Sequence, residues 1–172
     1  TSNRCCLGGM VGNNSCGSHS LVYGSTRDHL IEAEVILSDG TCTHFRNLSR
    51  GEFEAKLNSE SKTESAIYNF VDSLLHNSRA KLEIKENFPD ASLRRRNTGY
   101  ALDELLATNK SEDEYINLLP LLAGSEGTLA LISEIKVNLV PLPPVEKALV
   151  CAYCASLEDI FKANLVALEH SP

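Results

Sequence analysis

The stretch Leu7-Gly-Gly-Met-Val-Gly-Asn-Asn-Ser-Cys-Gly17 tells most about the fold of this 172-residue chain. Glycine recurs along it, with asparagine, serine and cysteine in between. Small residues let a backbone approach a ligand closely, and glycine adopts positive φ at little cost. The spacing fits neither the GxGxxG pattern of classical dinucleotide sites nor the GxxxxGK[ST] pattern of phosphate loops. By itself the stretch predicts either a structural loop or a ligand site lined by backbone.

On the C-terminal side of this stretch, the hydrophobic patterns predict several strands and helices. Residues 30–38 alternate between apolar and polar, Asp39-Gly40 signals a hairpin, and residues 41–45 form the returning strand. Apolar residues at helical spacing predict a helix over 64–77, started by a capping box between Ser61 and Glu64. The other expected elements are a short helix over 78–88, a loop entering a short helix over 94–108, a polar loop over 110–114, a strand at 135–139, a strand over 148–154, and a helix over 157–169 capped by Ser156.

Charge and composition exclude some classes of function. The net charge is −7 and the pI about 5.2, which argues against nucleic acid as the main partner, because binding phosphates needs clustered Lys and Arg. The cluster Arg94-Arg-Arg96 is typical of a solvated surface, with anion or partner contact as the alternative. No apolar run approaches the ~20 residues of a membrane-spanning helix. We expect a globular cytoplasmic protein, with attachment at the inner membrane face as a variant.

The cysteines and histidines give no metal-ligand pattern. Because no paired cysteine framework is present, we expect reduced thiols. Cys151 and Cys154 have CxxC spacing, but a buried strand over 148–154 would point them to opposite faces. The histidines lack spacings such as HxH or HExxH. We therefore predict no metal site, and surface or partly buried roles for His19, His29, His44, His76 and His170.

The order of several motifs resembles a known family. The segment Leu7–Gly24 is followed by Thr26-Arg-Asp28, by Leu37-Ser-Asp-Gly40 and later by Gly124-Ser-Glu-Gly-Thr-Leu-Ala-Leu-Ile132. This order resembles the vanillyl-alcohol-oxidase-type FAD-binding domain. It is most similar to the FAD-linked oxidases of D-2-hydroxy acids, such as the glycolate, D-lactate and D-2-hydroxyglutarate dehydrogenases. The segment Arg95-Arg-Asn-Thr-Gly-Tyr-Ala-Leu-Asp103 also looks like a motif of that group.

The resemblance implies FAD as cofactor, held chiefly by backbone groups of two segments. Ala130 stands where the family usually has glycine, and it is small enough for the site to persist. His19 lies near the first segment, where a polar loop residue is the ordinary interpretation and covalent flavin attachment the alternative. The Glu126 carboxylate is expected to bind backbone N–H groups before Thr128. The cofactor-binding residues implied are Gly9, Asn13, Asn14, Ser15, Cys16, Gly17, Glu126, Gly127, Thr128, Leu129 and Ile132.

The resemblance also implies a domain plan and a fold class. Residues 1–144 would form the C-terminal lobe of the FAD-binding domain, and residues 145–172 the start of a substrate-binding cap domain. The expected fold is α+β: a mixed, largely antiparallel sheet with helices on one side, then the first strand and helix of the cap. The family's Arg-Gly-Gly-Gly-like pyrophosphate loop and most of its catalytic residues are not found here. We therefore expect a fragment whose catalytic residues are unknown.

The implied function is oxidation of a small-molecule D-2-hydroxy acid to a 2-keto acid. The electron acceptor stays open between a quinone, an iron–sulfur partner and another acceptor, and an iron–sulfur cluster elsewhere in the full protein is an analogy. Three alternatives remain: an inactive, flavin-free fragment, a flavin oxidase of alcohols, sugars or amines, and a non-flavin interaction module. The partners expected are the missing N-terminal lobe and the rest of the cap. Exposed edges there predict self-association into a homo-oligomer.

Overall fold

The chain divides into two compact units, Thr1–Val140 and Pro141–Pro172. The computed structural model describes residues 4–90, 92–93, 96, 99–108, 116–142, 145–146 and 148–170. The loop predicted over 110–114, as well as Arg94 and Arg95, lies outside these residues. No helix in the described part of the chain is long and apolar enough to cross a membrane. The functional identities given to residues 1–144 and 145–172 stay predictions.

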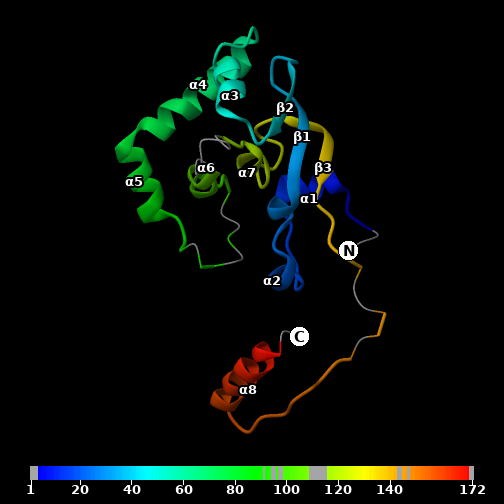
Figure 1. Ribbon diagram of the computed structural model, residues 1–172. Helices are drawn as coiled ribbons and strands as arrows, with labels where there is room; N and C mark the ends of the chain where they lie inside the picture. The colour runs from blue at the N-terminus through cyan, green and yellow to red at the C-terminus, as the bar shows by residue number, and fades with distance from the viewer. Residues whose placement is uncertain are drawn as a thin grey trace. The chain divides into compact units, whose positions relative to one another are not determined.

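The first unit is built on a three-stranded antiparallel sheet with the order β2-β1-β3. Strand β1 (Leu30–Ile36) lies in the middle, between β2 (Cys42–Arg46) and β3 (Leu131–Val137) (Figure 1). Together with the helices, this confirms the predicted α+β class. All strand pairs among the described residues are antiparallel, so the sheet is smaller and more uniform than the expected mixed sheet.

The β1–β2 hairpin forms where Asp39-Gly40 predicts it. The Leu37 N–H donates to the Thr41 carbonyl at 2.9 Å, and Gly40 has a φ of 84°, which suits glycine. The Asp39 carboxylate accepts hydrogen bonds from Thr63 and Thr41, which lower the pKa of Asp39 to about 2. These local contacts fix the register that buries Ala33 and Val35.

Helices pack against the sheet: in Figure 1, α3 to α7 lie to the left of the strands, and α1 lies next to β1 and β3. Helix α4 is the longest helix, and its buried face carries Tyr68, Val71 and Leu75. Phe53 of α3 packs edge-to-face against Tyr68, with ring centroids 5.9 Å apart. The helical elements of the first unit are α1 (Leu7–Asn13), α2 (Ser20–Tyr23), the 3₁₀ helix η1 (Thr26–His29), α3 (Arg50–Leu57), α4 (Lys62–His76), α5 (Ser78–Asn87), α6 (Leu102–Thr108) and α7 (Leu119–Leu122).

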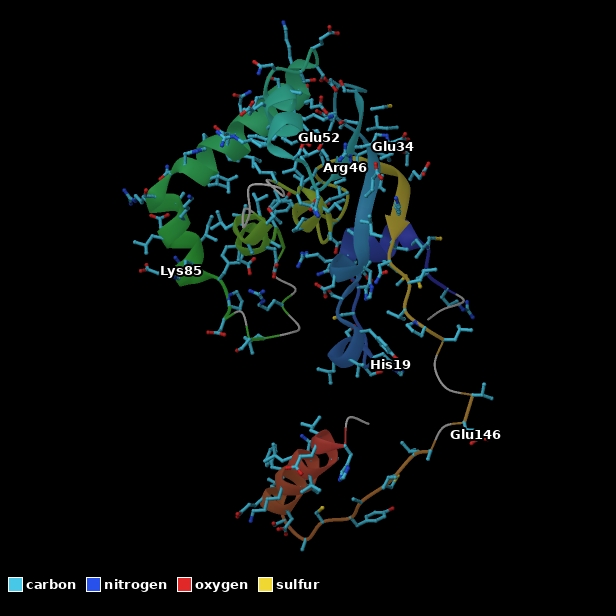
Figure 2. All side chains as sticks on the ribbon, viewed as in Figure 1. His19, Glu34, Arg46, Glu52, Lys85 and Glu146 are labelled. Carbon is cyan, nitrogen blue, oxygen red and sulfur yellow. The ribbon has the colours of Figure 1, made fainter. Side chains whose placement is uncertain are left out.

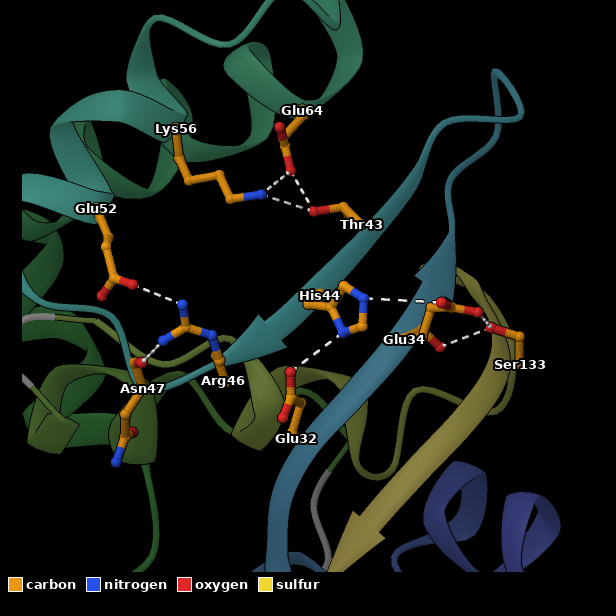
Figure 3. A network of polar contacts seen from close by, with 10 residues as sticks. All are labelled: Glu32, Glu34, Thr43, His44, Arg46, Asn47, Glu52, Lys56, Glu64 and Ser133. Carbon is orange, nitrogen blue, oxygen red and sulfur yellow. Dashed lines mark hydrogen bonds and ion pairs between the residues drawn. The ribbon is translucent and has the colours of Figure 1, made fainter.

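The predicted capping box at the start of α4 forms only in part. The Ser61 hydroxyl accepts the Glu64 N–H at 3.2 Å, as expected. The Glu64 carboxylate instead turns into the protein, where it binds the Lys56 ammonium at 2.6 Å and the Thr43 hydroxyl (Figure 3). It also accepts a hydrogen bond from the Ser59 hydroxyl at 2.5 Å. Glu64 is 6% exposed, so this cluster joins α3, α4 and β2 through a buried charge.

Acid is expected to weaken this unit through Glu64 and Glu52. Burial acts to raise the pKa of Glu64, but the hydrogen bonds from Lys56, Ser59 and Thr43 together lower it below 4.5. The hydrogen bond from Arg46 lowers the pKa of Glu52 to about 2. A carboxylate with a lowered pKa in the folded state stabilises it above the unfolded pKa, and this stability is lost as the pH falls through the folded pKa.

We therefore predict that the free energy of unfolding falls as the pH drops from about 4.5 toward about 2. Urea unfolding at a series of pH values measures it, and the Glu64→Gln variant should lose part of the acid-sensitive component. An unfolding free energy independent of pH across this range would contradict the assignment.

Arg96 departs from the solvated role predicted for the arginine cluster. Its guanidinium binds Asp103 and Glu104, each at 2.5 Å, and the side chain is 18% exposed. The arginine thereby ties the segment before α6 to the first turn of that helix. The acidic residues seven and eight positions after Arg96 account for its departure from a solvated role.

The second unit contains one helix among its described residues, α8 (Leu157–Glu169). The Ser156 hydroxyl accepts the Asp159 N–H at 3.2 Å, which confirms the predicted N-cap. The strand predicted over 148–154 is wrong: these residues are irregular, and Tyr153 is fully exposed. An apolar segment becomes a strand only beside a partner strand, and none pairs with it among the described residues. The buried setting expected for Cys151 and Cys154 is therefore also wrong.

Candidate functional site

The glycine-rich stretch forms helix α1 and packs beside the loop 123–128. The Gly124 N–H donates to the Val11 carbonyl, and the Glu126 N–H donates to the Gly12 carbonyl, both at 2.9 Å. The Asn13 side-chain amide donates to the Glu126 carboxylate at 2.9 Å. Two segments more than a hundred residues apart in the sequence are thus brought together.

Asn14 ends helix α1 and is held inside the protein. Its φ of 47° is left-handed, a conformation that asparagine tolerates better than most residues. The side chain is almost fully buried, and its oxygen accepts the Arg27 N–H at 2.9 Å. The Ser15 N–H turns back to the Met10 carbonyl at 2.9 Å. Asn14 therefore sets the direction of the chain through 15–17, and its own side chain serves the fold.

Arg27 is a residue that the sequence did not single out by itself. Its Nε donates to the Pro120 carbonyl at 3.1 Å and its Nη2 to the Ala123 carbonyl at 2.7 Å. Burial lowers the pKa of its guanidinium from the ordinary value. The arginine thus ties the segment after α2 to the loop that carries Glu126. Only its place in Thr26-Arg-Asp28, beside the glycine motif, hinted at a role.

The loop 123–128 needs left-handed backbone at three neighbouring positions. Gly124 and Gly127 have φ values of 89° and 75°, and Glu126 has 53°. A Cβ on Gly124 would lie 3.2 Å from Arg27 Nη2 and 3.4 Å from the Gly99 carbonyl, so a side chain there meets both strain and crowding. The Thr128 hydroxyl lies 2.6 Å from both the Ser125 carbonyl and the Tyr100 hydroxyl.

The carboxylate of Glu126 corrects one prediction. It accepts its hydrogen bond from the Asn13 side chain, so the expectation that it binds N–H groups of its own turn is wrong. The left-handed backbone of Glu126 turns the side chain toward α1. This hydrogen bond joins Asn13 and Glu126, two of the predicted site residues, and no local sequence pattern could predict it.

The predicted site residues differ in exposure. Asn13, Gly17 and the run Glu126–Leu129 are exposed, whereas Ser15, Cys16 and Ile132 are half-buried. Gly9 is exposed, and a Cβ on either Gly9 or Gly17 would meet no atom within 4 Å. The surface formed by the two segments is therefore open and carries small residues and backbone.

A hollow of about 450 Å³ adjoins the first segment. Its walls include Ser15, Cys16 and Gly17 on one side and Gly24 to Thr26 on the other. Small-molecule sites usually measure ~300–1,000 Å³ and bury most of their ligand. Backbone, hydroxyls and small side chains suit a phosphate-bearing, hydrogen-bonding molecule such as FAD, but the hollow can hold only a part of one.

His19 lies at the start of α2, as Figure 2 shows, and it is exposed. His29 bonds through Nε2 to the Tyr23 carbonyl at 2.7 Å, and it lines the hollow beside the first segment. On the sheet, His44 lies 3.1 Å from Glu32 and 3.7 Å from Glu34 through different ring nitrogens (Figure 3). Within the described ranges, no group of three or more His, Cys, Asp or Glu side chains could hold a metal ion.

Comparison with known proteins assigns the first segment to a family. The family described as FAD binding domain matches residues 1–46. A D-2-hydroxyglutarate dehydrogenase of Escherichia coli is 36% identical over 147 residues, which cover 86% of this chain and 14% of that protein. The enzyme of the same name from Pseudomonas putida is 30% identical over 172 residues, 100% of this chain and 16% of that protein. The chain therefore spans about one sixth to one seventh of the length of these relatives.

These similarities agree with the resemblance expected from the motifs: residues 1–46 match the FAD-binding-domain family, and the chain is similar to part of D-2-hydroxyglutarate dehydrogenases. The likeness to the P. putida dehydrogenase extends over the whole chain and so includes both glycine motifs, whereas the FAD-binding-domain match ends with β2. The roles of the individual site residues are tested by neither comparison and stay predictions.

Proposed function

We propose that this chain, whose residues 1–46 match the FAD-binding-domain family, forms part of the flavin site of an FAD-dependent dehydrogenase of D-2-hydroxy acids. The observation that carries the proposal is the contact between the two glycine motifs, made by Asn13, Glu126 and Gly12. It brings Asn13 of the first predicted cofactor segment next to Glu126 of the second. D-2-hydroxyglutarate is the first candidate substrate, because relatives that are 30% and 36% identical to this chain are named D-2-hydroxyglutarate dehydrogenases.

The residues of this chain would hold the cofactor by backbone groups and small side chains. Gly9 and Gly17 leave room for close approach, and Asn13 and Thr128 offer polar side chains beside them. Asn14 and Arg27 would support the site without contacting the cofactor, since their hydrogen bonds fix the backbone direction of both segments. Bound FAD supplies a two-electron acceptor for the oxidation of a CH–OH carbon to C=O.

Bulky side chains at the open glycines are expected to block FAD without unfolding the chain. Gly17→Val adds three methyl-sized atoms where the protein itself leaves space, so we predict FAD binding at least about tenfold weaker, which corresponds to ~1.4 kcal/mol. Titration of FAD with the protein, followed by flavin fluorescence, measures the affinity. Gly51→Val is the matched control, because Gly51 lies on α3 and also has open space around it.

The substrate is tested in a chimaera in which this chain replaces the 147 matched residues of the E. coli relative. We expect the chimaera to retain flavin and to oxidise D-2-hydroxyglutarate, but not the L enantiomer, with an artificial electron acceptor. A folded chimaera without flavin would overturn the cofactor assignment. A flavin-bearing chimaera that oxidises none of the D-2-hydroxy acids would overturn the substrate class alone.

A further inference from the structure

Strand β3 lies at one edge of the sheet. In the described part of the chain, β1 pairs with one side of β3 and no strand pairs with the other (Figure 1). An edge strand presents a row of backbone N–H and C=O groups that can pair with another chain. The side chains along this edge are accessible: Glu134 and Lys136 are exposed, and Leu131 and Leu139 are 66% and 81% exposed.

The backbone direction along the edge follows from one hydrogen bond. The Asn138 N–H donates to the His29 carbonyl at 2.8 Å, so the backbone groups of residue 138 face β1. These directions alternate along an antiparallel strand. The N–H and C=O groups of Ile135 and Val137 therefore point away from β1, toward the open edge. A second antiparallel strand can bind there without breaking a bond of the present sheet.

The sequence of β3 is complementary to itself in one register. When two copies pair antiparallel about a two-fold axis at Ile135, residue 134 lies opposite residue 136 of the other copy. Glu134 of each copy then lies opposite Lys136 of the other copy. Opposite charges directly across from each other stabilise a strand pair. An axis at Glu134 or at Lys136 would instead place like charges opposite each other, which is unfavourable.

The ends of the strand agree with the same register. Leu131 and Leu139 lie on the two sides of Ile135, so the antiparallel arrangement brings the exposed leucine of one copy near that of the other. Pro141 follows soon after and cannot donate a backbone hydrogen bond, which limits the length of the pairing. The bulge between Ile132 and Glu134 limits it at the other end. A contact this short predicts a weak dimer that depends on protein concentration.

We propose that β3 is a docking edge for a second copy of this chain, which pairs with it antiparallel about an axis at Ile135 and is specified by the Glu134–Lys136 contacts. The arrangement is isologous, because each copy gives the same strand to the other, and it closes after two copies. It turns two three-stranded sheets into one sheet of six strands.

Charge reversal tests the proposal on the whole chain. Glu134→Lys and Lys136→Glu each place like charges opposite each other, and we expect either change to weaken dimerisation about tenfold. Mixing the two variants restores complementary charges, so the mixture should form a heterodimer about as tight as the unchanged dimer. The double variant Glu134→Lys/Lys136→Glu should also dimerise normally. Glu86→Lys, on the exposed face of α5, is the control with no expected effect.

Sedimentation equilibrium over a wide concentration range gives the dissociation constants, and circular dichroism confirms that each variant is folded. A chain that stays monomeric at every concentration would overturn the proposal. A dimer that tolerates both single reversals would overturn it as well. Recovery in the mixed sample cannot arise from a loss of folding, so this measurement distinguishes a specific edge contact from general association.

Discussion

Replacement of Lys56 by methionine is expected to lower the free energy of unfolding by about 3 kcal/mol, because it leaves the Glu64 carboxylate buried without its cation. The ammonium of Lys56 lies 2.6 Å from Glu64 and 2.8 Å from the Thr43 hydroxyl. The Glu64 side chain is 8% exposed, so water cannot replace the lost partner. Urea unfolding at neutral pH measures the change.

Two further variants make this prediction specific. Lys85→Met removes a lysine from the exposed surface of α5 and should change stability little. Lys56→Met combined with Glu64→Gln removes both charges and should cost less than Lys56→Met alone. A loss in the double variant equal to the sum of the losses in Lys56→Met and in Glu64→Gln would show that the Lys56–Glu64 pair is not coupled.

The second large effect is expected at Arg27. Arg27→Met should destabilise the chain by about 3 kcal/mol, since two carbonyl groups would lose a charged donor. The guanidinium bridges Pro120 and Ala123, and a methionine fills similar space without donating a hydrogen bond. Because Ala123 begins the loop that holds Glu126, FAD binding should weaken along with stability.

Arg27→Lys should recover only part of the loss, because one ammonium cannot match the fork of the guanidinium. The control is Arg79→Met on α5, where the arginine is exposed and pairs with Glu83 four residues later. Such an exposed pair contributes at most about 1 kcal/mol. An unfolding free energy as little affected by Arg27→Met as by Arg79→Met would contradict the bridging role.

The elements that the sequence predicted well are set by neighbouring residues. Asp39-Gly40 supplies the turn geometry of the β1–β2 hairpin within four residues. Ser61 and Ser156 start α4 and α8 through hydroxyls that accept an N–H three positions later. Each signal lies inside the element that it starts, so no distant partner had to be known.

The predictions that failed concern contacts made over long distances along the chain. The strand expected over 148–154 required a partner strand, and apolar character alone does not provide one. The Glu64 carboxylate left the predicted capping box because Lys56 and Thr43, from other elements, bind it more favourably. The Glu126 carboxylate likewise accepts a hydrogen bond from the distant Asn13 side chain, where N–H groups of its own turn were expected.

The candidate site was predicted as a set of residues but not as a geometry. The motifs named both segments, and the resemblance implied that each contacts FAD. That Asn14 is buried, or that Arg27 ties the segments together, depends on the packing of α1 against the loop 123–128. The sequence also contains no helix signal for α1, because Gly8, Gly9 and Gly12 have low helix propensity. Packing around the buried Val11 offsets the free energy that these glycines cost the helix.

Backbone hydrogen exchange of the whole chain, with and without FAD, tests the central claim most directly. Joint binding by the two segments predicts that FAD slows exchange at residues 13–17 and 126–132, while α8 is unchanged. The Gly17→Val variant should lose the protection at both segments together. Slowed exchange confined to other parts of the chain, or an unchanged pattern while FAD is bound, would contradict the claim that these two segments form one flavin-binding surface.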